Sequence, residues 1–173
     1  EGYTSNERIK EESDFLRGNI SGLLHDGGIT HFPSEEEFLL KFHGITQQDN
    51  RDERLIRKKN GQERNWLFML RLRLPGGRIT PSQWLAAETL SDQFGNGTLK
   101  LTTRQAIQIH GVVKQDLKQT MKDIHHAAIT TIAASGDATR NVMVSLHPGV
   151  HDAGDHGGAQ SGGDGDRDIA QQT

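Results

Sequence analysis

Hydrophobic and polar residues along the middle of the chain follow the alternating pattern of β-strands. Residues 66–74 (WLFMLRLRL) change from a continuous apolar run to strict alternation, which predicts a strand that is buried on both faces at first and later has one polar face. Residues 99–102 and 106–112 alternate in the same way and predict two more strands. A last short strand is predicted at residues 142–144.

Two helices are predicted between these strands. Thr80, Pro81 and Gln83 form a helix-start signature, with a threonine cap, proline at the first helical position and glutamine three residues after the cap. Residues 95–97 (GNG) end this helix. A second helix is predicted from about Asp116 to Ile129, where apolar residues recur at intervals of four, three and four.

The order strand, helix, strand, strand, helix, strand is typical of a ferredoxin-like split β-α-β sheet. In this α+β fold the helices cover one face of the sheet. The pattern therefore predicts a ferredoxin-like half-domain over residues 64–145.

The two flanks of this segment have weaker patterns. Residues 6–25 predict a helix with Asn6 as its cap, and residues 38–42 predict a strand or an extended packing arm. Residues 46–62 are polar with charges of alternating sign, and we interpret them as a solvated connector. Residues 1–63 are thus expected to form an amino-terminal helix, arm and connector.

The carboxy-terminal residues 146–173 are rich in Gly, Asp and His. Such a composition offers almost nothing to bury, so this tail is predicted to be disordered.

Composition excludes several classes of partner. The 173 residues suffice for one domain with a core. With 20 Lys+Arg against 23 Asp+Glu, the net charge of -3 gives no global attraction to nucleic acid or to a membrane surface. No apolar run approaches the roughly 20 residues that span a bilayer, and the first residues do not resemble a secretory signal. We therefore expect a cytoplasmic protein without nucleic-acid or membrane partners.

The chain contains no cysteine. This excludes disulfides, thiolate catalysis and an ordinary iron-sulfur cluster held by this chain alone. The histidines do not show the spacing of a recognised metal site, and the adjacent pair His125 and His126 would point in different directions on a helix. No metal site is predicted.

Three arginines occupy positions where the predicted fold places functional groups. Arg71 lies where the first strand begins to alternate, Arg104 lies between two strands, and Arg140 precedes the last strand. The guanidinium group keeps its charge and presents a planar fork that suits carboxylates and oxyanions. The set would suit a polyanionic ligand, although each arginine could equally be exposed or paired locally.

Several motifs occur together in one order along residues 6–144. They are residues 41–44 (KFHG), 47–52 (QQDNRD), 69–77 (MLRLRLPGG), 95–100 (GNGTLK), 102–105 (TTRQ), 108–111 (QIHG) and 136–142 (GDATRNV). With these motifs the chain resembles the amino-terminal part of assimilatory sulfite reductases, in the nitrite/sulfite reductase family.

The resemblance implies the six-electron reduction of sulfite to sulfide on a sirohaem bridged to a four-iron cluster. It also implies that ferredoxin or an NADPH-dependent flavoprotein supplies the electrons. It associates Arg71 and Arg140 with the substrate oxyanion and Arg104 with the sirohaem carboxylates. The neighbouring positions that it assigns to the cofactor site are Thr102, Thr103, Gln105, Gln108, His110 and Asn141.

The family's cluster cysteines and additional substrate-site lysines lie in segments that this sequence does not contain. The chain is therefore expected to contribute part of the sirohaem pocket, to need a carboxy-terminal catalytic half and to be inactive alone. Two hypotheses stay open: a fragment of the oxidoreductase, or a noncatalytic binding or assembly module for a separate catalytic half. Nitrite is the alternative substrate, but the amino-terminal arm and residues 47–49 favour sulfite.

Overall fold

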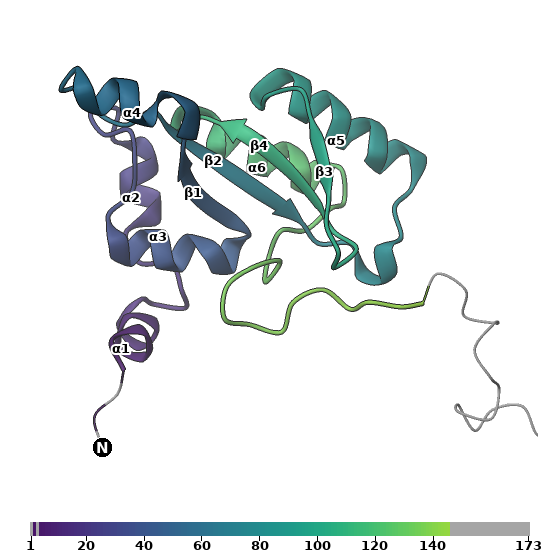
Figure 1. Cartoon of the computed structure of the whole chain (residues 1–173). Coiled ribbons are helices and arrows are strands. Elements are labelled where there is room, and N and C mark those ends of the chain that lie inside the picture. Colours follow the sequence, from purple (N-terminus) through teal and green to yellow (C-terminus); the bar gives the residue numbers. More distant parts are fainter. Residues whose placement is uncertain (1, 3, 146–173) are drawn as a thin grey trace, which may run out of the picture. The chain divides into compact units, whose positions relative to one another are not determined.

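A four-stranded antiparallel sheet forms the centre of the fold (Figure 1). The structure is a computed structural model that describes residue 2 and residues 4–145. The strands β1 (Ile45–Asp49), β2 (Trp66–Leu72), β3 (Leu99–Leu101) and β4 (Ile107–Val112) lie in the order β1-β2-β4-β3. The tail predicted at residues 146–173 lies outside the described residues.

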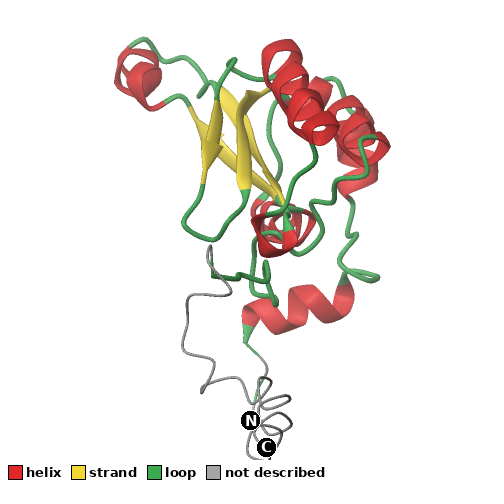
Figure 2. Ribbon diagram, turned by 90° about the vertical axis from the view of Figure 1, so that its right-hand side faces the viewer, coloured by secondary structure: helices red, strands yellow, loops and turns green. Residues whose placement is uncertain are grey.

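Helices cover one face of this sheet, as the pattern predicts (Figure 2). Helix α5 (Pro81–Phe94) begins with the predicted capping box, in which Thr80 and Gln83 each accept the backbone N–H of the other. Helix α6 (Leu117–His126) ends earlier than predicted, and Ala128 just beyond it adopts a left-handed conformation with φ 54°. A short 3-10 turn, η3 (Lys114–Asp116), precedes α6.

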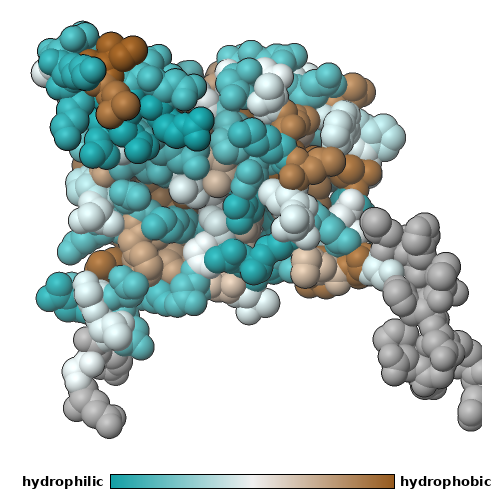
Figure 3. All heavy atoms as spheres, in the orientation of Figure 1, coloured by the Kyte–Doolittle hydropathy of each residue, from teal (hydrophilic) through white to brown (hydrophobic). Residues whose placement is uncertain are grey.

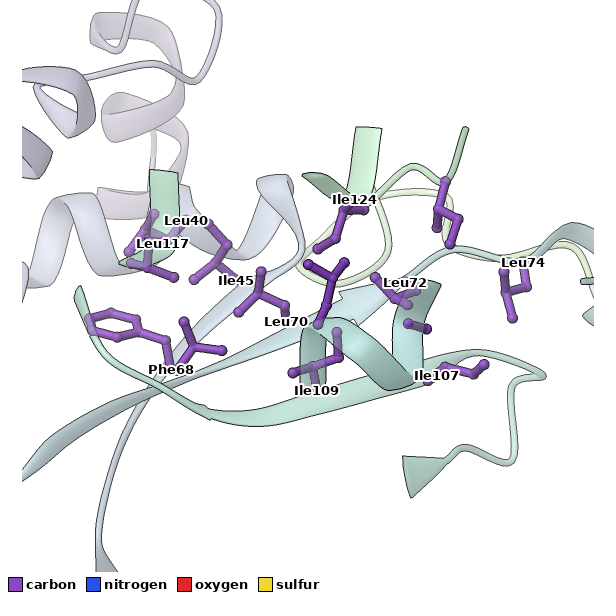
Figure 4. Close-up of a cluster of buried hydrophobic side chains, with 14 of the residues drawn as sticks. Leu40, Ile45, Phe68, Leu70, Leu72, Leu74, Ile107, Ile109, Leu117 and Ile124 are labelled. Atoms are coloured by element: carbon purple, nitrogen blue, oxygen red, sulfur yellow. The ribbon is translucent and has the colours of Figure 1, made fainter. Parts of the chain in front are cut away.

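The core lies between the sheet and these helices (Figure 4). Every second residue of β2 points inward, and Phe68, Leu70 and Leu72 are fully buried. They pack in one cluster with Ile107, Ile109 and Val112 of β4 and with apolar side chains of α5 and α6. Burial of this apolar surface is the main stabilising contribution to the fold.

The fourth strand of the sheet differs from the prediction. Residues 142–144 form no strand, and the side chains of Val142 and Met143 are 57% and 56% exposed. The position beside β2 belongs to β1, which pairs with it antiparallel from Ile45↔Leu70 to Asp49↔Trp66. The sequence pattern hides β1 because Gln47, a polar residue, occupies a buried position in the strand and bonds to both backbone groups of Phe32.

The predicted solvated connector at residues 46–62 is therefore wrong. Its first part is β1, and its second part is helix α4 (Arg51–Lys59), which begins at an Asn50 cap. No residue of α4 is buried, and Leu55 and Ile56 are 70% and 62% exposed. Figure 3 shows the apolar patch over α4 within hydrophilic surroundings. The helix is held by polar contacts, including the ion pair between Arg54 and Asp49.

Two predictions in the amino-terminal region also need correction. The single helix predicted at residues 6–25 is two helices, α1 (Ser5–Glu12) and α2 (Ile20–His25), and the cap of α1 is Thr4. The break occurs because residues 14–16 adopt left-handed backbone conformations with φ from 47° to 64°.

The strand or arm predicted at residues 38–42 is helical. It belongs to α3 (Ser34–Leu40) and to the following 3-10 turn η1 (Lys41–His43). The apolar run reflects burial of Leu39, Leu40 and Phe42, and a short buried run does not by itself distinguish a helix from a strand.

Candidate anion-binding site

The sheet face opposite the core carries a group of basic and polar side chains. Because Leu70 and Leu72 point into the core, Arg71 emerges on the other face of β2, and Arg73 follows directly after the strand ends. The register places Arg71 opposite Gln108 of β4, and Gln108 opposite Lys100 of β3. These three side chains therefore form one row across the sheet.

The Gln108 side chain connects Arg71 to His110. In the amide orientation that satisfies both neighbours, its oxygen accepts from Arg71 Nε at 3.1 Å and from Nη2 at 2.6 Å. Its nitrogen then donates to His110 Nε2 at 3.1 Å. Two contacts to one oxygen fix the plane of the guanidinium group and leave its remaining N–H groups available.

Arg104 lies in the turn between β3 and β4, after the short 3-10 turn η2 (Pro75–Gly77) and helix α5. The Thr102 hydroxyl accepts the backbone N–H groups of Arg104 at 3.3 Å and Ala106 at 3.1 Å, so it organises this turn. Gln105 takes a left-handed conformation with φ 54°. Thr103 and Arg104 are exposed at the tip of the turn.

Arg140 reaches the same region from residues 131–143, an irregular segment without helix or strand. Its Nε donates to the carbonyl oxygen of Gly136 at 3.1 Å, and its own carbonyl oxygen accepts from Arg73 Nη2 at 3.2 Å. The next residue, Asn141, donates through Nδ2 to the carbonyl oxygens of Leu74, Arg104 and Gln105 at 2.8, 2.8 and 3.0 Å.

The electrostatics of Arg71 reflect these neighbours. Its pKa is lowered below the usual value for arginine, first by burial and then by the positive charges of Arg140 and Arg104. It keeps its charge nevertheless, because guanidinium groups do not lose their proton in proteins. The pKa of His110 is lowered from 6.5, first by burial and then by the charges of Lys100 and Arg71.

No described carboxylate compensates this positive charge. The ion pairs among residues 4–145 involve other arginines, lysines and histidines, and none includes Arg71, Arg73, Lys100, Arg104 or Arg140. Two buried polar atoms in this region, Arg73 Nε and Asn141 Oδ1, also have no hydrogen-bond partner within the described part. Chemically, the arrangement can bind an anion that carries several oxygen atoms.

The structure brings the predicted site residues from three segments into one region. Arg71, Gln108 and His110 come from the sheet, residues 102–105 come from the β3–β4 turn, and Arg140 and Asn141 come from the irregular segment. The sequence analysis missed Arg73 and Lys100. The alternation of β2 could have revealed Arg73, which shares a face with Arg71, whereas Lys100 required the register between strands.

The polar atoms of two predicted residues face the backbone. Thr102 accepts from two N–H groups, and Asn141 donates to three carbonyl oxygens. Among the described residues, no group of three or more His, Asp or Glu side chains could hold a metal ion. Nor does this part of the chain contain a helix with the length and apolar character needed to cross a membrane.

Comparison with known proteins identifies the middle of the chain. Residues 60–127 match the family model of the nitrite/sulfite reductase ferredoxin-like half domain. This match includes the whole sheet except β1, together with α5 and α6.

Two relatives match most of the chain but only a small part of their own length. The sulfite reductase (NADPH) subunit beta of Saccharomyces cerevisiae is 56% identical over 147 residues, which are 83% of this chain and 10% of the yeast protein. The sulfite reductase (NADPH) hemoprotein beta-component of Bacillus subtilis is 49% identical over 142 residues, 82% of this chain and 25% of that protein. The chain therefore spans between a tenth and a quarter of the length of these relatives.

A solved structure shares the fold at lower identity. The NirA protein of Mycobacterium tuberculosis superposes with a TM-score of 0.67 at 20% sequence identity, over 84% of this chain and 28% of NirA. This similarity supports the ferredoxin-like architecture.

Proposed function

The chain belongs to the nitrite/sulfite reductase family, and on that premise we propose that it forms the cationic, anion-binding part of a sulfite reductase haemoprotein. The proposed reaction of the whole protein is the six-electron reduction of sulfite to sulfide. The proposed task of this chain is to hold the substrate oxyanion and the carboxylates of the cofactor.

The observation that carries this proposal is a cluster of arginines that no described carboxylate neutralises. Arg71 is affected by the charges of Arg140 and Arg104, and no described acidic residue pairs with any of the three. Like charges repel, so such a cluster is costly unless a ligand supplies the opposite charge. A bound polyanion would supply it.

The residues suit sirohaem, a tetrapyrrole with many carboxylates. In the proposed complex Arg104, with Thr103 and Gln105 beside it on the exposed turn, holds carboxylates at the edge of the open sheet face, and the Gln108–His110 pair lies beneath. The bound sirohaem would supply electrons to the substrate. The orphaned Nε–H of Arg73 is a further donor in the same region.

Arg71 and Arg140 are the proposed substrate contacts. Two guanidinium forks can bind different oxygen atoms of one sulfite ion, and they stabilise the negative charge wherever it concentrates during reduction. Gln108 orients Arg71 through two hydrogen bonds, so this fork does not have to be ordered when the anion binds.

Other parts of the whole protein must complete the reaction. A four-iron cluster needs thiolates, and this chain has no cysteine. We therefore propose a separate catalytic half that carries the cluster, with an NADPH-dependent flavoprotein or ferredoxin as electron donor. The alternative of a noncatalytic assembly module predicts that the chain binds that half but not the anion.

A calorimetric titration of the chain with sulfite tests the proposal. Replacing Arg71 or Arg140 by Gln one at a time should weaken sulfite binding about tenfold, because each removes one charge-assisted contact to the substrate. Arg51→Gln is the matched control, since Arg51 is exposed on α4 at the other end of the sheet. A parallel titration with nitrite compares the two candidate substrates.

Two results would overturn the proposal. One is an absence of sulfite binding by the unmodified chain. The other is a similar loss of affinity in the Arg51→Gln control and in the two site variants, which would indicate a nonspecific charge effect.

A further inference from the structure

Asn141 holds together the three segments that form the candidate anion site. Its Nδ2 donates to the carbonyl oxygen of Leu74 at 2.8 Å, just after β2, and to those of Arg104 and Gln105 at 2.8 and 3.0 Å in the β3–β4 turn. These partners are 67, 37 and 36 residues away in the sequence. One side-chain amide therefore fixes the irregular segment, the end of β2 and the turn relative to one another.

The segments that it joins carry mutually repelling charges. Arg140 is the residue before Asn141, Arg104 is one of the bonded residues, and Arg71 lies on β2 close enough for both charges to act on it. Without a ligand, repulsion between these cations favours separation of the segments that carry them. Hydrogen bonds between the segments must oppose that separation.

A neutral amide is suited to this task. An aspartate at position 141 would add a negative charge beside the arginines and so compete with an anionic ligand. An amide donates to carbonyl oxygens and leaves the guanidinium groups unpaired. The side-chain atoms of Asn141 also argue against direct contact with the ligand. Its Nδ2 donor is already hydrogen-bonded, and its buried Oδ1 is an acceptor, which an anion would not approach.

We propose that Asn141 is a positioning residue of the anion site, which fixes the Arg104 turn and the Arg140 segment against the end of β2. This inference rests on the proposed function. It differs from the family-based expectation that Asn141 contacts the cofactor. In this inference the Asn141 side chain binds backbone carbonyl groups of the site instead.

A double-mutant cycle on the complete chain, with inorganic sulfite as the probe, tests the inference. Asn141→Ala should weaken sulfite binding about tenfold in the unmodified background and less than about twofold in an Arg140→Gln background, because the residue acts on the substrate through the position of Arg140. Hydrogen exchange at the amides of residues 102–106 should accelerate in Asn141→Ala. Asn65→Ala is the control, since Asn65 donates a comparable bond to Glu53 at 3.2 Å near α4.

The outcomes separate this inference from the proposed function. If the unmodified chain binds no sulfite, the anion site itself is wrong. If the chain binds sulfite and Asn141→Ala binds equally well, or loses the same factor with and without Arg140, the positioning role is wrong. If Asn141→Ala does not fold, Asn141→Ser, which adds no charge, provides the same cycle, and unfolding of both variants would assign the amide to global stability and overturn the inference.

Discussion

Single neutral side chains determine how the charges of this site are arranged. Gln108 fixes the Arg71 guanidinium through one oxygen atom, and Asn141 fixes the backbone beside Arg104 and Arg140. Neither residue neutralises the arginine that it positions. The site therefore retains its positive charge for a ligand while its geometry is set by uncharged groups.

The lowered pKa of His110 predicts a pH dependence of stability. Burial, followed by the charges of Lys100 and Arg71, lowers the pKa in the folded chain below 6.5. Below about pH 6.5 the unfolded chain then binds more protons at this residue, so the free energy of unfolding should fall as the pH falls through this window. Urea unfolding at a series of pH values measures this slope.

A His110→Gln variant should show a shallower slope between pH 7 and about pH 5, because the group that takes up the proton is gone. His126→Gln is the control, since His126 is exposed on α6. An identical slope in the unmodified chain and in His110→Gln would contradict the prediction.

At the scale of elements, β2 has two functions on its two faces. Its inward residues Phe68, Leu70 and Leu72 form the centre of the core, and Arg71 on its outward face carries charge into the candidate site. Because successive residues of a strand alternate between faces, a rigid core on one side fixes the arginines on the other. The sheet is thus the support of the site.

Removal of a core side chain from β2 should destabilise the chain strongly. Leu70→Ala should lower the free energy of unfolding by about 2–5 kcal/mol, because the side chain is fully buried and leaves a cavity. Leu55→Ala on α4 should change it by less than about 0.5 kcal/mol, since that leucine is 70% exposed. Chemical denaturation of both variants measures these changes. Equal losses of unfolding free energy in the two variants would contradict the assignment of the core.

The start of α5 gives a second test at this scale. Thr80→Ala removes the hydroxyl that accepts the backbone N–H of Gln83, and it should lower the free energy of unfolding by about 1 kcal/mol. Thr89→Ala lies inside the same helix and should have a much smaller effect, because Thr89 is exposed and caps nothing. Thermal unfolding of the two variants distinguishes a cap from a general effect of losing a hydroxyl.

At the scale of the whole molecule, the chain carries cations but no thiolates. The described residues provide an open sheet face lined by arginines, while the sequence has no cysteine that could ligate a cluster. The relatives that match it are much longer, since their matched parts are only 25% and 10% of their length. Binding and electron transfer are therefore expected to reside in different parts of the whole protein.

The purified chain should contain no iron-sulfur cluster and should not reduce sulfite when an artificial reductant is supplied. The reason is the absence of thiolate ligands. Iron and acid-labile sulfide analysis, together with a sulfide assay, measures both properties. Stoichiometric cluster iron accompanied by sulfide formation would contradict this prediction.

The regular part of the fold could be predicted because its signals are local. The alternation of residues 66–74 predicts β2, and the cap at Thr80 predicts the start of α5, since each depends on neighbours within a few residues. The family motifs also predict a role for Arg71, Arg104 and Arg140 in one anion site, and that role stays a prediction. The structure shows that the charges of Arg104 and Arg140 act on Arg71.

What the tertiary structure alone decided depends on contacts between distant residues. β1 took the strand position predicted for residues 142–144, because Gln47 can be buried only when its amide bonds to the backbone of Phe32. Lys100 joined the site through strand register, and the Asn141 amide found three carbonyl oxygens at least 36 residues away. The sequence determined which groups are available, whereas the fold decided which of them meet, because hydrogen bonds act over about 3 Å.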